Sequence, residues 1–115
     1  MTAYAIAHLR QPGAVDAEVC EYLELIQATL DPFEGRFLVH GGQTRVLEGA
    51  WPGATVVLEF PDLAAAEEWY ASAEYRKILH LRTDHLVGDV ILVEGCGPDH
   101  DSAAMGARLR AEAAR

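Results

Sequence analysis

Cysteine is scarce in this sequence, which has only Cys20 and Cys96 among its 115 residues. Two cysteines are too few for a disulfide scaffold, and no C-x-x-C pair is present to bind a zinc ion. Neither cysteine has a positively charged neighbour in the sequence that would favour the reactive thiolate. We therefore expect both to be small buried hydrophobic residues and not nucleophiles.

Positive charge is also in short supply, because 9 Lys and Arg residues face 18 Asp and Glu residues and leave a net charge of −9. A surface of this charge repels nucleic-acid phosphates and anionic lipid head groups, so neither is an expected partner. No apolar run approaches the roughly 20 residues that span a bilayer, and the N-terminus lacks the basic and apolar regions of a signal peptide. A cytoplasmic location is expected.

The patterns that are present indicate one small α+β domain. Half of the residues are apolar and 23% are charged, which is typical of a chain that folds around a single core. Apolar residues at helical spacing predict two helical regions, and runs of β-branched and aromatic residues predict four strands. The strands are expected at residues 3–10, 36–40, 55–60 and 89–94, and the helical regions at about 16–30 and 62–86. This order, βαββαβ, predicts a ferredoxin-like antiparallel sheet with its helices on one face.

Capping residues mark the expected helix starts. Asp16 and Asp62 precede the two helical regions, and Ser72 predicts a break and a restart within the second. Residues 43–53 form a connection too long for a tight hairpin turn. Residues 97–115 carry only a thin apolar stripe, so they are expected to be a partly helical appendage to a domain of residues 1–96. This appendage is either a frayed terminal helix or a segment that docks on a partner subunit.

Alternation along the strands divides their side chains between two faces of the sheet. The first face is apolar and is expected to pack under the helices; it comprises Ala5, Ala7, Leu9, Phe37, Val39, Val56, Leu58, Phe60, Ile91 and Val93. The second face is half polar; it comprises Tyr4, Ile6, His8, Arg10, Arg36, Leu38, His40, Thr55, Val57, Glu59, Leu92 and Glu94. Four apolar residues of this face are poorly suited to water, so a homodimer joined through it is expected; they are Ile6, Leu38, Val57 and Leu92.

The charged residues of the second face permit two interpretations. Arg10 and Arg36 can pair with Glu59 and Glu94 inside the dimer and fix its register. Alternatively, these residues bind a substrate.

His8 and His40 are the candidates for proton transfer. With the strand order 4-1-3-2, both are expected on the second face, at the same end of the sheet and beside Thr55. Two strand spacings of about 4.8 Å would separate them, which is too far for both to bind one metal ion. Since no metal- or phosphate-binding motif occurs either, no metal or cofactor is expected. Histidine readily transfers protons near neutral pH, so either residue is a candidate general base; a hydrogen-bonded structural role is the alternative.

Five aromatic residues are expected to belong mainly to the core: Tyr22, Trp51, Trp69, Tyr70 and Tyr75. Their polar tips can also line a small cleft between the helices and the sheet, where ligands often bind. Of these, Tyr22, Trp69 and Tyr75 are candidate substrate-binding residues.

Four segments together resemble the family called domain of unknown function 1330. They are GRFLVHGG at residues 35–42, LEGAW at 47–51, EFP at 59–61 and WYASAEY at 69–75, and the similarity extends over about residues 3–95. Position 40 is His where the family pattern more often has Arg. The resemblance implies a dimeric α/β barrel, the architecture of antibiotic-biosynthesis monooxygenases, muconolactone isomerases and haem-degrading proteins. It implies no particular reaction, because this family has none assigned.

Two main functions are compatible with these observations. The first is a cofactor-independent, monooxygenase- or isomerase-like enzyme that acts on a small carbonyl-bearing molecule. In this hypothesis His8 or His40 moves a proton, and Arg10 or Arg36 holds an anionic oxygen. The second is a non-catalytic dimer that binds a small ligand or serves as an accessory module. Haem binding is a third option, disfavoured by the acidic charge balance.

Overall fold

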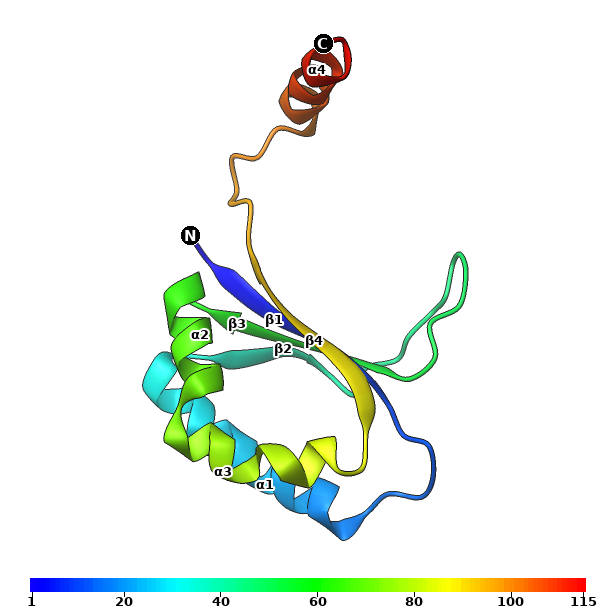
Figure 1. Ribbon diagram of the computed structural model, residues 1–115, viewed down its shortest axis with the longest axis vertical. Helices are drawn as coiled ribbons and strands as arrows, with labels where there is room; N and C mark the ends of the chain where they lie inside the picture. Colours follow the sequence, from blue (N-terminus) through cyan, green and yellow to red (C-terminus); the bar gives the residue numbers. More distant parts are fainter.

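The computed structural model describes residues 1–115 and shows an antiparallel sheet with helices packed on one face (Figure 1). The strands lie in the order β2-β3-β1-β4, and the predicted ferredoxin-like βαββαβ arrangement is confirmed. The strands are β1 (Ala3–Arg10), β2 (Arg36–His40), β3 (Ala54–Phe60) and β4 (Val87–Glu94). The helices are α1 (Ala17–Leu30), the short 3-10 turn η1 (Asp31–Phe33), α2 (Leu63–Ala71), α3 (Ala73–Thr83) and α4 (Ser102–Ala113). No helix has the length and hydrophobicity needed to cross a lipid bilayer.

The predicted capping residues begin the helices that cover the sheet. The carboxylate of Asp16 accepts a hydrogen bond from the Glu18 N–H at 2.8 Å, and Asp62 accepts one from the Ala65 N–H at 2.8 Å. Ser72 separates α2 from α3, and its hydroxyl oxygen accepts a hydrogen bond from the N–H of Tyr75 at 3.3 Å. The chain therefore bends at Ser72.

The core lies between the sheet and helices α1, α2 and α3. Tyr75, Phe60 and Leu30 are its largest fully buried side chains. Burial of an apolar side chain of this size stabilises the fold by about 1.5–3 kcal/mol. The aromatic cluster is continuous, because Trp69 contacts both Phe60 and Tyr75, with ring centroids 5.5 and 4.2 Å apart.

Strand β2 contains a β-bulge, and the residues that follow it lie on faces of the sheet opposite to those predicted. Phe37 pairs with Leu58, but the next paired residue, Val39, lies opposite the adjacent Val57, so Leu38 is an extra residue in the strand. Because side chains alternate, this insertion turns Val39 to the open face of the sheet and His40 to the helix side. The prediction for both residues was wrong for this reason.

The residues of strand β4 also lie on faces of the sheet opposite to those predicted. Leu92 lies opposite Ala5 and packs against the core, whereas Ile91 lies opposite Ile6 and is 55% exposed. Val93 shares the open face with Ile91, while the prediction had placed both under the helices. Residues 90–93 are all apolar, so their pattern contains no alternation that could set the phase.

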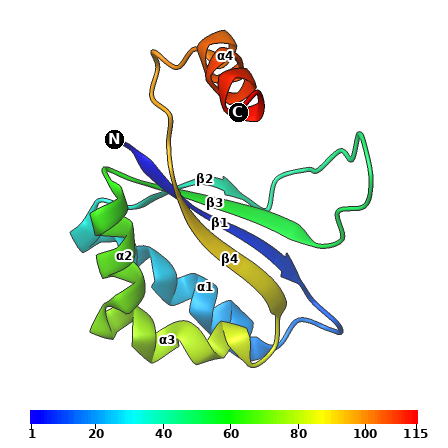
Figure 2. The same ribbon diagram turned by 45° about the horizontal axis from the view of Figure 1, so that its top comes forward.

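Two segments extend from the body on the side of the open sheet face (Figures 1 and 2). The first, residues 41–53, contains no helix or strand and returns to β3 through Gly53. Gly53 has a φ of 103°, and a Cβ atom there would lie 2.2 Å from the Leu9 carbonyl oxygen, so glycine is required. The second segment is the C-terminal tail, in which every residue of α4 is exposed. Both cysteines are also exposed, contrary to the prediction.

Candidate ligand cavity between the helices and the sheet

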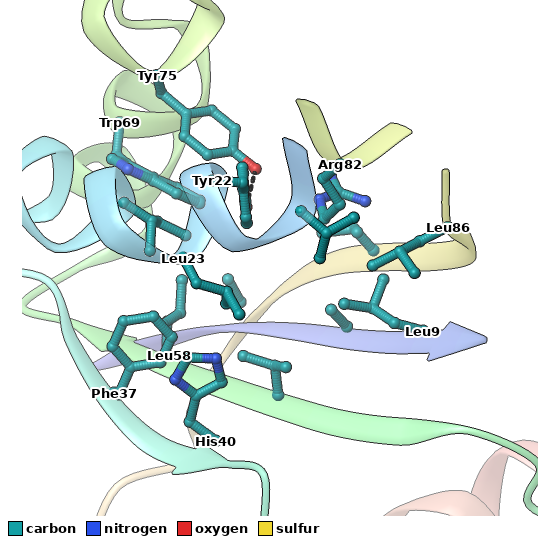
Figure 3. Close-up of a pocket in the computed structure, with 16 residues that line it drawn as sticks. Leu9, Tyr22, Leu23, Phe37, His40, Leu58, Trp69, Tyr75, Arg82 and Leu86 are labelled. Atoms are coloured by element: carbon teal, nitrogen blue, oxygen red, sulfur yellow. Dashed lines mark hydrogen bonds between the residues drawn. The ribbon is translucent and has the colours of Figure 1, made fainter. Parts of the chain in front are cut away.

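A cavity of about 70 Å³ lies between the helices and the sheet (Figure 3). Its walls are mostly apolar and come from all four strands and from α1, α2 and α3. The lining residues are Ala5, Ala7, Leu9, Val19, Tyr22, Leu23, Ile26, Phe37, His40, Val56, Leu58, Trp69, Tyr75, Arg82, Leu86 and Val90. A concave apolar space that a few polar side chains enter is typical of small-molecule sites.

The mouth of the cavity lies between α1 and β2. Leu23 of α1 lines the cavity and is 47% exposed, and His40 of β2 lines it from an exposed position. The His40 ring stacks on Phe37, with 4.2 Å between ring centroids and 8° between ring planes. Its nitrogens have no hydrogen-bond partner in the protein. The stack therefore holds the imidazole of His40, whose nitrogens are free of protein hydrogen bonds, at the mouth and on the sheet side of the cavity (Figure 3).

Two tyrosine hydroxyls meet on the helix side of the cavity. The hydroxyls of Tyr22 on α1 and Tyr75 on α3 are hydrogen bonded at 2.7 Å (Figure 3). Trp69 packs on Tyr75 and is itself fixed, because its Nε1 donates a hydrogen bond to the Thr29 hydroxyl at 3.0 Å. Burial, reinforced by the neighbouring Tyr75, raises the pKa of Tyr22 far above its ordinary value. Tyr22 is therefore a neutral hydroxyl group that can donate or accept a hydrogen bond.

Arg82 is a cavity residue that the sequence interpretation missed. It follows Tyr75 by two helical turns on α3, so both side chains lie on the helix face that covers the sheet. Arg82 is only 6% exposed, and its guanidinium carbon lies 5.7 Å from the centre of the Tyr22 ring. Burial alone lowers the pKa of Arg82, but the adjacent Tyr75 and Tyr22 hydroxyls outweigh it and raise the pKa, so the side chain is positively charged.

The remaining predicted site residues do not line the cavity. Arg36 forms an ion pair with Glu59 across β2 and β3, with 2.7 Å between Nη2 and Oε1, inside a single subunit. Arg10 takes part in no ion pair. Arg36 and Glu59 both lie on the open face of the sheet. An ion pair on a solvent-exposed surface typically adds about 0–1 kcal/mol to the free energy of unfolding.

His8 lies on the opposite face of the sheet from His40. Its ring stacks on Trp51 with 4.5 Å between centroids, and its Nε2 is hydrogen bonded to the Pro52 carbonyl. Trp51 is 48% exposed and outside the core, contrary to the prediction, and it donates a hydrogen bond from Nε1 to the Thr55 hydroxyl at 2.8 Å. His8 thus lies beside Thr55 as predicted, but it contacts residues 51 and 52 and is not paired with His40. The bulge in β2 is the reason.

One cluster of potential metal ligands lies outside the cavity. Nε2 of His85 is 2.7 Å from Glu18 Oε1 and 3.4 Å from Asp16 Oδ1. The Asp16 oxygen is also the acceptor that caps α1. These three residues serve each other as partners and join the start of α1 to the end of α3.

Solved structures with the same fold share little sequence with this chain. A protein of unknown function from Rhodopseudomonas palustris is 16% identical, with a TM-score of 0.67 and 84% of each chain covered. A dimeric ferredoxin-like protein of unknown function from Jannaschia sp. CCS1 is 14% identical, with a TM-score of 0.63 over 83% of this chain and 100% of the other. SnoaB, a cofactor-independent oxygenase from Streptomyces nogalater, is 13% identical, with a TM-score of 0.59 over 87% of this chain and 98% of the other. Identities this low establish the fold and not the reaction.

The sequence itself matches one family. No curated protein matches the chain, but the domain of unknown function DUF1330 matches residues 2–96. The predicted division of the chain at residue 96 stays a prediction, and the family match ends at the same residue. All of the cavity-lining residues lie within the matched segment. The chain therefore belongs to the DUF1330 family.

Proposed function

We propose that this protein is a cofactor-independent enzyme that removes a proton from a small carbonyl-bearing molecule bound in the cavity. The observation that carries the proposal is the unengaged imidazole of His40 at the mouth of an apolar cavity whose helix side holds polar donors. SnoaB, with the same fold, is described as a cofactor-independent oxygenase, which supports chemistry without a cofactor on this framework.

In this mechanism the C–H bond next to the carbonyl breaks and its proton passes to a nitrogen of His40. The electron pair moves onto the carbonyl oxygen, which gains negative charge. The Tyr22–Tyr75 pair keeps one hydroxyl proton free, and in this proposal it donates that proton to the carbonyl oxygen. The apolar walls strengthen the interaction by excluding water. Trp69 positions Tyr75 through ring packing. His8, Arg10, Arg36 and Glu59 have no contact with the ligand in this proposal.

Hydrogen–deuterium exchange tests this proposal without knowledge of the natural substrate. Small ketones, β-diketones and oxo acids are incubated with the protein in deuterated buffer, and loss of the α-proton signal is followed by NMR. We expect the wild-type protein to accelerate exchange for at least one compound class. His40→Ala should reduce that acceleration by about 100-fold or more, since general bases contribute rate factors of this size.

His80→Ala is the matched control, because His80 is an exposed histidine of α3 that does not line the cavity. The His80→Ala variant should catalyse hydrogen–deuterium exchange of the substrate as fast as the wild-type protein does. Exchange that is no faster than buffer across the panel, or that survives in His40→Ala, would contradict the enzyme proposal. Saturable binding without any exchange would favour the non-catalytic ligand-binding alternative.

We also propose that two copies join through the open face of the sheet. Val39, Ile91 and Val93 are between 40% and 55% exposed on this face, which is unusually apolar for a surface in water. The fold relative from Jannaschia is described as dimeric, which supports this arrangement.

A further inference from the structure

Arg82 carries a positive charge on the wall of the cavity. It is more than nine-tenths buried, and none of the ion pairs in the molecule includes it. A buried charge without an oppositely charged partner is unfavourable, and Arg82 has the uncharged Tyr22 ring beside it, with 5.7 Å between its guanidinium carbon and the ring centre. The atoms of its guanidinium group are not sealed off, because no fully enclosed polar side-chain atom lacks a partner. Arg82 lines the cavity, close to the Tyr22 ring.

A count of donors and acceptors shows what this end of the cavity lacks. Arginine contributes several N–H donors and no acceptor, and each tyrosine contributes one O–H donor. The hydrogen bond between Tyr22 and Tyr75 uses one of the two hydroxyl protons. The phenolic oxygens are the only acceptors among these groups, and no carboxylate forms an ion pair with the arginine. Donors thus exceed acceptors, and an anionic oxygen would complete the set.

We propose that Arg82, on the cavity wall beside the Tyr22–Tyr75 pair, is the binding subsite for the carboxylate of a short-chain organic acid, and that the one free tyrosine hydroxyl is left for the carbonyl oxygen. This inference rests on the same cavity as the proposed function and narrows its substrate class to oxo acids with one negative charge. One arginine in apolar surroundings suits a single negative charge. The cavity volume of about 70 Å³ is half that of the roughly 150 Å³ cavity that binds benzene. A short acid therefore fits with its carboxylate at Arg82 and its chain directed toward His40.

Binding of propionate tests the subsite, with propionamide as the uncharged compound of nearly the same shape. NMR titration of the protein, followed at the indole N–H of Trp69 and the backbone amides around the cavity, gives both affinities. We expect saturable binding of propionate and binding of propionamide that is weaker by about tenfold or more, because hydrogen bonds to charged groups contribute about 1.5–3 kcal/mol. Equal affinity for the two compounds, or no saturable binding of propionate, would overturn the proposal.

Arg82→Met removes the charge and keeps most of the volume. Propionate affinity should fall by about tenfold or more in this variant. The control, Arg76→Met, should bind like wild type, because Arg76 is exposed and lies over the Tyr70 ring instead of the cavity. Unchanged propionate affinity in Arg82→Met would contradict the assignment.

Thermal unfolding separates a binding role from a structural one. Replacing a buried unpaired charge with an apolar side chain should leave the melting temperature of Arg82→Met equal to or above that of wild type. A large decrease would mean that Arg82 stabilises the fold. Propionate has no carbonyl next to its α-carbon other than the carboxylate, so its binding is measured apart from turnover. Propionate can therefore bind at Arg82 even if the protein catalyses no exchange. Likewise, the protein can catalyse exchange even if propionate does not bind at Arg82.

Discussion

His85 joins two helices through the carboxylate of Glu18. The 2.7 Å hydrogen bond to Glu18 is the main reason that the pKa of His85 lies above its ordinary value of 6.5, and Asp16 and Asp84 add to the effect. A raised pKa means that the folded protein binds the proton more tightly than the unfolded chain does. The contribution to stability is therefore complete below pH 6.5 and is lost as the pH rises through the folded pKa.

Urea unfolding of wild type and His85→Gln at about pH 6 and about pH 9 checks this dependence. At about pH 6 the wild-type protein should have a higher urea midpoint than His85→Gln. At about pH 9 the difference in midpoint between the two proteins should be smaller. His80→Gln should match wild type at both values, because His80 has no acidic partner. A difference that grows with pH would contradict the assignment.

Single residues of the cavity were predictable to different degrees. Tyr22, Trp69 and Tyr75 were expected to belong mainly to the core, since aromatic residues at helical spacing face it, and a cleft lined by their polar tips was the alternative. Arg82 occupies the same stripe, between Ile78 and Leu86, and a charged residue in an apolar stripe is a signal that was present in the sequence. What the sequence could not show was that no acidic side chain approaches it, because this depends on how distant segments pack.

At the scale of elements, Ser72 fixes the bend between α2 and α3. Its hydroxyl donates to the Trp69 carbonyl at 2.7 Å and accepts from the Tyr75 N–H, so it holds both aromatic residues of the cavity wall. Ser72→Ala should lower the free energy of unfolding by about 1 kcal/mol, as is typical for loss of a helix cap. Urea denaturation measures this change.

Asp101→Ala supplies a matched control. Asp101 caps α4 by accepting hydrogen bonds from the N–H groups of Ala103 and Ala104 at 2.9 and 3.4 Å. Because every residue of α4 is exposed, loss of this cap should leave the cooperative unfolding transition unchanged. Equal destabilisation by the two substitutions would show that α4 is part of the cooperative unit.

The elements differ in how far local sequence determines them. Helix starts were predictable because a cap is a contact between residues close in sequence, as at Asp16, Asp62 and Ser72. The faces of β2 and β4 were not, because a bulge is visible only in the pairing with β3, and residues 90–93 are apolar on both sides. A one-residue error in register reverses every side chain, which is why His40 was assigned to the wrong face.

For the whole molecule, the open face of the sheet determines the expected association. Ile91→Glu places a charge on this face, and Leu25→Glu places the same charge on an exposed part of α1. We expect wild type and Leu25→Glu to sediment as dimers and Ile91→Glu to sediment as a monomer, since burying an unpaired carboxylate is highly unfavourable. A monomeric wild-type protein, or an Ile91→Glu dimer, would contradict the proposed interface.

The projecting tail gives the molecule an asymmetric distribution of charge. Residues 102–115 contain three Arg and one Glu, a charge of +2, and taking this from the chain's −9 leaves −11 on residues 1–101. Because α4 stands away from the body, the two charges are separated in space and give the protein a large dipole moment (Figure 1). Forces between copies then depend on their mutual orientation at low ionic strength. At about 0.1 M salt the Debye length shortens to about 10 Å and this orientation dependence fades.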